Sequence, residues 1–573
     1  MKILGKFKIE TSSEELKIDM DSLVSGINDF KDYIISIDEN REIVYVISKV
    51  CDHAGGRLIV KDDLAVCPMH NWKLNLVSLK YNDSHIQKSK IEYDISENRY
   101  LTVGGQNRNL TNPFRSDKKG KVSIRWINHA TVIIECNGVK LMTDPWLFGP
   151  AFLTGWWLAT TSPVDSINLL KEVDYVYISH NHPDHLHAET LSLLNKRKPI
   201  ITPKFISASS KIFLQKLGFE NVITCDFIDI IELGENFQFS ILKSGDFRDD
   251  SGIYLCANGH EFLFTVDSNF LNSNVLPEKI DLLMTSFAGG ATGFPLCYEN
   301  YTEDEKIKII KRNRNSIKAN VIRYIKQVQP KYYMPYAGMF AEYAERDNYI
   351  RERNYKNLIE EYEQIAIQFQ ANAIRPESDK VIIFEDGNMH IDRINEIEYL
   401  GEEAASFYIN NFKKDYPYDP ESVLNYLKNS QYHGKQILQI IPTDDSFFRC
   451  IGEVIFADFD KGIFKTIDQA AIIDRKENYR VMSLKIRVEI LMCVVLNYLP
   501  WEDISIGFQM RASRYPNEYE SDFWYHFTNI YIAKENFRYT SYCGACTIVD
   551  QNPIWIKTDI QKLMQNPTVF KKG

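Results

Sequence analysis

Cysteine is scarce in this sequence and irregularly spaced. Ten cysteines occur among 573 residues, whereas small secreted scaffolds carry dense cysteine pairs that form disulfides. Long apolar runs are also missing. The longest, VEILMCVVLNYLPW at 488–501, is interrupted by Glu489 and Asn497 and is too short to span a bilayer. The amino-terminal stretch lacks the apolar core of a signal peptide. We therefore expect a cytoplasmic protein with no membrane span, in which this run forms a buried helix.

An excess of positive charge is missing as well. Asp and Glu outnumber Lys and Arg by 77 to 67, which gives a net charge of −10 at pH 7. Proteins that bind nucleic acids use clustered Lys and Arg to neutralise phosphates, so we expect no nucleic-acid partner. An anionic small-molecule substrate stays compatible with this charge, because it needs only a local basic pocket.

Residue patterns divide the chain into three domains and a linker. Residues 1–104 contain short β-branched and aromatic segments between turn residues, which predicts an all-β domain. A polar stretch with glycine and proline at 105–120 predicts a linker. Strands alternate with helical segments over 121–388, which predicts an α/β domain. Residues 389–573 predict a mixed α+β region. The fold class is therefore multidomain, α/β plus all-β.

Two Cys/His pairs in the first domain have the spacing of a metal site. Cys51 and His53 form a C-x-H pair, and Cys67 and His70 form a C-x-x-H pair. A Rieske [2Fe–2S] centre needs this mixture, because two thiolates hold one iron and two imidazoles hold the other. A structural zinc site is the alternative. We predict that these four residues bind a Rieske cluster.

A second metal motif lies in the α/β domain. The apolar segment DYVYIS runs directly into H-x-H-x-D-H, so that a strand end and a tight loop would bring several ligands to one place. With Asp144 upstream and Asp267 downstream, the pattern resembles the metallo-β-lactamase superfamily. The resemblance implies an αββα sandwich and the candidate ligands His180, His182, Asp184, His185 and Asp267.

The sequence departs from the hydrolases of that superfamily at two ligand positions. Those enzymes hold two metals and use a third and a fourth histidine, but the corresponding segments here, LKSGDFRDDSGIY and MPYAGMF, contain none. The obvious remaining set is His180, His182 and Asp267. Two histidines and one carboxylate are the ligand set of a mononuclear non-haem Fe(II) oxygenase. One or two zinc ions are the alternative.

Several nearby residues have roles that the sequence leaves open. Asp184 and His185 either bind metal in a rearranged site or orient the ligands. Asp246 or Asp249 is a candidate replacement for the third histidine. We expect His129 to lie beside the metal without binding it, and His260 to be a solvated residue of a hairpin turn.

The order of the two motifs is similar to that of the CMP-N-acetylneuraminate hydroxylases. Stretches outside the metal motifs match as well, among them TDPWLFGPAFLTGWWL, TSFAGGATGFPL, QPKYYMPYAGMF and LPWEDISIGFQMRASRYPNEYESDFWYHF. The resemblance implies a monooxygenase that uses O₂ and external electrons to convert the N-acetyl group of CMP-linked sialic acid to N-glycolyl. It also implies a small electron carrier, a b5-type cytochrome or a ferredoxin, with its reductase.

Other functions remain open at this point. An oxygenase of this kind could act on another sugar nucleotide, amide or amine. A dinuclear-zinc hydrolase could carry the Rieske domain as a redox or structural module, with a metal-bound hydroxide as nucleophile. A non-enzymatic electron-transfer or scaffold protein is the third reading. A homo-oligomer is compatible with each of them.

Overall fold

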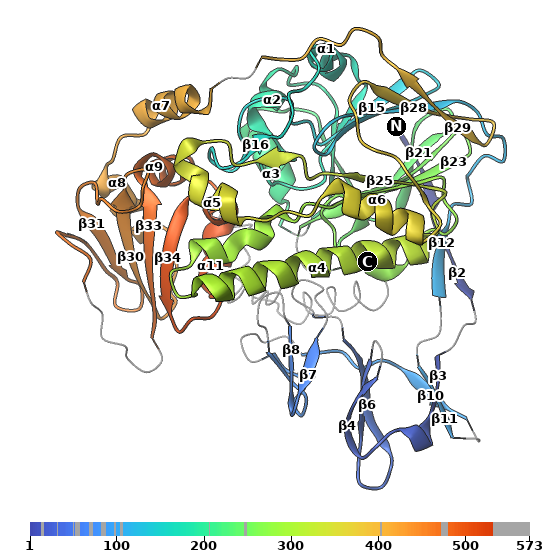
Figure 1. Cartoon of the computed structure of the whole chain (residues 1–573), viewed down its shortest axis with the longest axis horizontal. Helices are drawn as coiled ribbons and strands as arrows, with labels where there is room; N and C mark the ends of the chain where they lie inside the picture. The colour runs from blue at the N-terminus through green and yellow to red at the C-terminus, as the bar shows by residue number, and fades with distance from the viewer. Residues whose placement is uncertain are drawn as a thin grey trace.

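The computed structural model describes residues 1–530, apart from 13–15, 31–32, 50, 52–57, 68–72, 82–86, 97–98, 104–106, 206, 246–248, 402–403 and 472–478. Three regions follow one another in Figure 1: a small β domain, a central body of two large sheets, and a further sheet with helices. Among the described residues, no helix is long and apolar enough to cross a membrane.

The small β domain consists of three antiparallel sheets of three strands each, β4-β5-β6, β7-β8-β9 and β10-β11-β3. Alternation along its strands explains how it folds. Ile34 pairs with Ile47 and Ile35 with Val46, and the two pairs face two different apolar clusters, because successive side chains of a strand point to opposite faces. Its strands are β3 (Leu16–Asp19), β4 (Gly26–Phe30), β5 (Tyr33–Ile37), β6 (Ile43–Ser48), β7 (Ile59–Lys61), β8 (Leu64–Val66), β9 (Lys73–Asn75), β10 (Tyr93–Ile95) and β11 (Tyr100–Val103).

The central body contains two sheets of eight strands. One has the order β19-β18-β17-β15-β14-β13-β28-β29 and the other the order β1-β20-β21-β22-β23-β24-β25-β27. The first is built from β13 (Val122–Asn128), β14 (Thr131–Cys136), β15 (Val139–Thr143), β17 (Tyr175–Tyr177), β18 (Ile200–Pro203), β19 (Val222–Cys225), β28 (Lys380–Glu385) and β29 (Asn388–Arg393). The second is built from β1 (Lys2–Lys6), β20 (Asp229–Gly234), β21 (Phe237–Lys243), β22 (Ser251–Ala257), β23 (His260–Phe264), β24 (Leu282–Ser286), β25 (Tyr332–Tyr336) and β27 (Asn372–Ala373).

The two sheets pack face to face, with helices on their outer sides. In β22, Ile253 and Leu255 point into the core between the sheets, whereas Tyr254 and Cys256 point outward into a second core. That second core is shared with α4 (Glu303–Val328) and α6 (Ile359–Gln368). The helices α1 (Asp165–Glu172), α2 (Ala188–Ser192) and α3 (Ser209–Lys216) cover the outer side of the other sheet. The αββα sandwich predicted from the sequence is confirmed.

The region after the sandwich is a five-stranded sheet with helices, in the order β32-β31-β30-β33-β34. The apolar run forms α9 (Val488–Asn497), most of which is buried, as predicted. The remaining elements of this region are α7 (Ala405–Asp415), α8 (Pro420–Asn429), β30 (Gln436–Thr443), β31 (Val454–Asp458), β32 (Ile463–Ile467), β33 (Arg480–Arg487), α10 (Glu502–Ile506), β34 (Met510–Tyr515) and α11 (Ser521–Thr528). It packs against the sandwich through α5 (Asn348–Arg353) and the 3₁₀ helices η3 (Gly290–Cys297) and η4 (Glu345–Asp347).

Strand pairing crosses the boundaries that the sequence suggested. β1, at the start of the chain, pairs with β20 at the edge of a central sheet. β12 (Asn107–Thr111) lies within the stretch predicted as a linker and pairs with β2 (Lys8–Ser12). β29 continues the other central sheet beyond residue 388. The first two pairings join segments far apart in the chain, so local composition does not reveal them, whereas β29 forms a hairpin with β28.

Candidate metal centre

The candidate ligands lie where several parallel strands end. β17 and β15 are parallel neighbours, as are β23 and β24. Asp144 follows β15, His180 follows β17, and Asp267 follows β23. The carboxyl ends of parallel strands meet at one edge of a sheet, where α/β proteins commonly bind ligands. After His180 the chain makes a tight turn, in which the amides of His185 and Leu186 both donate to the His182 carbonyl oxygen.

Two histidines and one aspartate form the first group of this centre. His180, His182 and Asp250 can each offer one donor atom within 4.8 Å of the other two. Nε2 of His180 lies 2.9 Å from Nδ1 of His182 and 3.6 Å from a carboxylate oxygen of Asp250. Donor atoms about 2.1 Å from one ion lie about 3 Å apart when they subtend a right angle at it. The two facing nitrogens therefore fit a shared metal ion.

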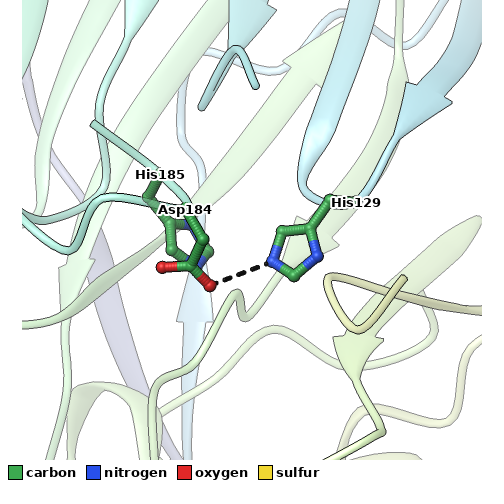
Figure 2. A group of neighbouring side chains, drawn as sticks. All are labelled: His129, Asp184 and His185. Carbon is green, nitrogen blue, oxygen red and sulfur yellow. Dashed lines mark ion pairs between the residues drawn. The ribbon is translucent and has the colours of Figure 1, made fainter. Parts of the chain in front are cut away.

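His129, Asp184 and His185 form the second group (Figure 2). Nε2 of His129 lies 3.2 Å from a carboxylate oxygen of Asp184, which lies 3.5 Å from Nε2 of His185. All three side chains are buried. Within the described residues, both ring nitrogens of His129, Oδ1 of Asp184 and Nε2 of His185 have no hydrogen bond. Buried polar atoms nearly always have partners, so these donors fit a metal ion.

Asp267 lies between the two groups. With His180 and His185 it forms a third set whose donor atoms lie within 4.8 Å of one another, and a carboxylate oxygen of Asp267 is 3.5 Å from Nε2 of His185. Burial acts to raise the pKa of Asp267, but the neighbouring His185 outweighs it and lowers that pKa below its usual value. Asp267 is therefore a carboxylate in a position to contact both groups.

A buried aspartate orients the histidines of this centre. Asp144 is fully buried and accepts hydrogen bonds from Nδ1–H of His185 at 3.0 Å and from the Ser179 hydroxyl at 2.7 Å. That hydroxyl in turn lies 3.0 Å from Nδ1 of His180. Both imidazoles are thereby held with Nε2 directed to the centre, which is the usual role of a carboxylate behind a metal-binding histidine.

Replacing Asp144 by Asn is expected to weaken metal binding by about 10- to 100-fold. The amide can present N–H instead of oxygen to Nδ1 of His185, which favours the wrong imidazole tautomer. The measurement is the dissociation constant of Co²⁺ for the metal centre of the sandwich. Asp174→Asn is the control, because Asp174 only accepts a backbone hydrogen bond from Lys140 on an exposed surface. Unchanged Co²⁺ affinity in Asp144→Asn would contradict this role.

Asp250 stands where the sequence lacks the third histidine. Asp246, one of the two candidates from the sequence, lies outside the described residues. The other, Asp249, accepts hydrogen bonds from the hydroxyls of Ser207 and Ser209. The carboxylate that groups with His180 and His182 is therefore the next residue, Asp250, because adjacent residues of an extended chain point in opposite directions.

His129 stands close to the segment that lacks the fourth histidine. Its backbone oxygen accepts a 2.9 Å hydrogen bond from the amide of Ala337, which lies within MPYAGMF. We expected His129 to lie beside the metal without binding it, whereas its ring lies in the second group of possible ligands. His129 has φ +42° and Asp144 φ +39°, in the left-handed region that histidine and aspartate enter more readily than most residues.

The expectation for His260 was wrong. His260 is fully buried at the start of β23, and its Nδ1 lies 3.5 Å from a carboxylate oxygen of Asp281. Its ring lies in the aromatic packing around Phe384 and Phe262. The tight hairpin between β22 and β23 indicated an exposed turn, but the turn itself is Asn258-Gly259, and His260 already belongs to the strand.

The carboxyl-terminal region also reaches the centre, which the sequence did not indicate. An oxygen of Glu502, the first residue of α10, lies 3.5 Å from Nε2 of His182. Burial lowers the pKa of His182, but hydrogen bonding to Glu502 and the charge of that carboxylate outweigh burial and raise it to about 9. No local motif marks Glu502, because only the tertiary fold brings α10 to this place.

The two cysteines predicted for the Rieske site lie in one core. Cys51 follows β6, and Cys67 follows β8 directly. Both are fully buried within the same apolar cluster, together with Leu58 and Leu74. Their predicted partners His53 and His70 lie outside the described residues. The geometry of the four-ligand set therefore stays a prediction.

Comparison with known proteins identifies the family. Residues 123–292 match the model of the beta-lactamase superfamily domain. The cytidine monophosphate-N-acetylneuraminic acid hydroxylase of Danio rerio is 31% identical, over 89% of this chain and 92% of its own. The Mus musculus protein of the same name is 30% identical, over 88% of this chain and 93% of its own.

Two solved structures were also compared. One is CmlA, a diiron beta-hydroxylase from Streptomyces venezuelae, with 17% identity, 50% and 55% coverage of the two chains, and a TM-score of 0.32. The other is an isothiocyanate hydrolase from Delia radicum gut bacteria. It is 12% identical, the match covers 46% of this chain and 99% of that chain, and the TM-score is 0.33. Likeness at this level does not bear on function. The match to the hydroxylases spans nearly the whole of both chains, and the protein is thus an oxidoreductase that belongs to the family of the cytidine monophosphate-N-acetylneuraminic acid hydroxylases.

Proposed function

We propose that this chain is a Rieske-type, iron-dependent monooxygenase that converts the N-acetyl group of CMP-N-acetylneuraminate to N-glycolyl. In this reaction one atom of O₂ enters a methyl C–H bond and the other leaves as water, while two electrons and two protons are consumed. A small carrier, a cytochrome b5 or a ferredoxin, supplies the electrons. The substrate follows from the named relatives.

The group His180, His182 and Asp250 carries this proposal. Zinc hydrolases of this fold use imidazole where Asp250 stands, and two histidines with one carboxylate are characteristic of oxygen-activating Fe(II). The second group, His129, Asp184 and His185, lies beside the first and shares the neighbour Asp267. We therefore propose two iron ions at this centre, in place of the single iron that the sequence favoured. When bound, iron at this centre activates O₂.

Buried aromatic side chains pack against two histidines of the centre. The ring of Trp156 stacks on Phe340 with centroids 3.6 Å apart, and Phe340 lies against His129 at 6.3 Å. Phe152 covers His182 at 5.8 Å. All three aromatic side chains are buried. These rings shield His129 and one side of His182, while the side chains of His182 and Asp267 stay 19% and 33% exposed, so solvent and substrate can reach the centre from that side.

We assign electron delivery to residues 1–104 as a Rieske domain, with Cys51, His53, Cys67 and His70 as cluster ligands. The two described ligands share one buried core. Arg312 of α4 lies near Cys67: burial lowers the pKa of its guanidinium, against the opposing effect of the cysteine charge. A cation beside a cluster ligand stabilises the added electron of the reduced cluster. Residues 121–388 then form the oxygenase domain, and 389–573 the carboxyl-terminal region, whose described part packs against it.

Product analysis under ¹⁸O₂ tests the function. The purified protein is supplied with CMP-N-acetylneuraminate, ferredoxin, ferredoxin reductase and NADPH, and cytochrome b5 with its reductase replaces ferredoxin in a parallel assay. We expect a product that is heavier by one ¹⁸O atom and requires both O₂ and reductant. Conversion that proceeds without O₂, or a product that takes its oxygen from H₂¹⁸O, would show a hydrolase instead.

A further inference from the structure

The carboxyl-terminal domain contributes one side chain to the metal centre. Nδ1 of His182 faces Nε2 of His180 at 2.9 Å, so Nδ1 is the nitrogen directed to the metal. The other nitrogen, Nε2, lies 3.5 Å from the Glu502 carboxylate. Glu502 therefore lies behind His182, on the side away from the metal position, as Asp144 lies behind His185.

We propose that Glu502 is the positioning residue of His182 and that the carboxyl-terminal domain thereby completes the metal centre of the sandwich. The Nε2–H of His182 donates to Glu502, which fixes the tautomer whose Nδ1 lone pair binds metal. A carboxylate behind an imidazole also raises its basicity and hence its strength as a ligand. Asp144 comes from the sandwich itself, whereas Glu502 requires the docked carboxyl-terminal domain.

Two glycines hold α10 against the sandwich. A Cβ atom on Gly155 would lie 2.2 Å from the carbonyl oxygen of Gly507, and a Cβ on Gly507 would lie 2.3 Å from that of Phe152. Such distances exclude any side chain, so the backbone that ends α10 touches the loop carrying Phe152. Phe152 in turn packs on the His182 ring. The contact places the first turn of α10, and with it Glu502, at a fixed distance from His182.

A buried polar network anchors the same domain nearby. Arg487 of β33 is fully buried and donates to Asp347 at 2.6 Å and to Gln509 at 2.8 Å. Arg346 donates to Thr154 at 2.8 Å, next to Gly155. These bonds connect η4, the loop after Phe152, and the segment that follows α10. Breaking one partner of such a buried pair is costly, so the docked position is strongly determined.

Cobalt binding by the full-length protein tests the proposal. The metal centre of the sandwich is emptied with a chelator. It is then titrated with Co²⁺ in competition with a chromophoric chelator. We expect Glu502→Ala to raise the Co²⁺ dissociation constant by about 10- to 100-fold and to change the Co²⁺ absorption spectrum. Glu502→Asp should recover part of the affinity, because it restores an acceptor for Nε2–H. The inference rests on the proposed metal centre but not on the substrate, so failure to hydroxylate CMP-N-acetylneuraminate leaves this readout intact.

Glu518→Ala is the matched control. The Glu518 side chain is 34% exposed, as is that of Glu502 in the same domain, and it pairs at 3.4 Å with Lys73 of the small β domain instead of with a residue of the metal centre. The Glu518→Ala variant should bind Co²⁺ with the same affinity as the wild type.

Gly155→Ala, which pushes α10 away, should weaken Co²⁺ binding, and its effect should not add to that of Glu502→Ala. If Glu502→Ala lowers the melting temperature strongly, Glu502→Leu, which keeps most of the side-chain volume but has no hydrogen-bond acceptor, replaces it. Wild-type Co²⁺ affinity and spectrum in a folded Glu502→Ala or Glu502→Leu protein, or strict additivity of Glu502→Ala with Gly155→Ala, would overturn the proposal.

Discussion

Replacement of His180 by alanine is expected to abolish hydroxylation, with product formation reduced about 1,000-fold or more. His180 belongs to two of the three donor sets, with His182 and Asp250 and with His185 and Asp267. Its loss therefore removes a ligand from the first group and disturbs the place where the two groups meet. We expect the iron content of the metal centre in the sandwich to fall together with activity, both measured on the same preparation.

His187→Ala is the control for this variant. His187 lies two residues after the motif and is similarly buried, but it caps α2, and its ring bonds to Thr190 and to the carbonyl oxygen of Pro150. Burial lowers its pKa to about 4, so the ring is neutral at pH 7. The loss of such a cap costs about 1 kcal/mol of stability and should leave metal content unchanged. Full iron content and turnover in His180→Ala would contradict the assigned site.

Replacement of Cys67 by serine is expected to remove the Rieske cluster. The variant should lose the visible absorption and the acid-labile sulfide, keep the iron of the second site, and form no product with the carrier as electron donor. Serine lacks the thiolate that holds the cluster iron. The measurements are iron, sulfide and product per chain.

Cys136→Ser provides the comparison for the cysteine variant. Cys136 is also a buried free cysteine, but it lies in β14 of the sandwich. Burial raises the pKa of its thiol to about 12, so it stays protonated and is a poor metal ligand. Its substitution should preserve the cluster. A Cys67→Ser protein that retains labile sulfide and turnover would contradict the assignment of residues 1–104.

The extent to which the sequence predicted this site depends on how far apart its residues lie. His180, His182, Asp184 and His185 occupy one loop after one strand, so their spacing alone indicated a shared metal site. The αββα sandwich followed from the same motif and its flanking aspartates. Within the segment 242–254 the sequence could not select Asp250, because adjacent residues of an extended chain point in opposite directions and the sequence does not show which of them faces the centre.

The remaining site residues depend on tertiary structure. His129 sits at the turn between β13 and β14 and meets Asp184, which follows β17, because the pairing order β17-β15-β14-β13 brings these strand ends together at one edge of the same sheet. Glu502 arrives from a separate domain through the contact between Gly155 and Gly507. β1 joins a sheet whose other strands begin after residue 228. Neither hydrophobic periodicity nor composition encodes which distant segments will pack together.

The most direct test is the content of iron, zinc and acid-labile sulfide per chain, measured on anaerobically purified full-length protein produced with both metals available. A Rieske cluster accounts for about two irons and two sulfides, and the two groups of the metal centre would add about two irons more. We therefore expect about four irons, about two sulfides and little zinc per chain. About two irons and two sulfides with zinc in the second site would contradict an oxygenase at this centre.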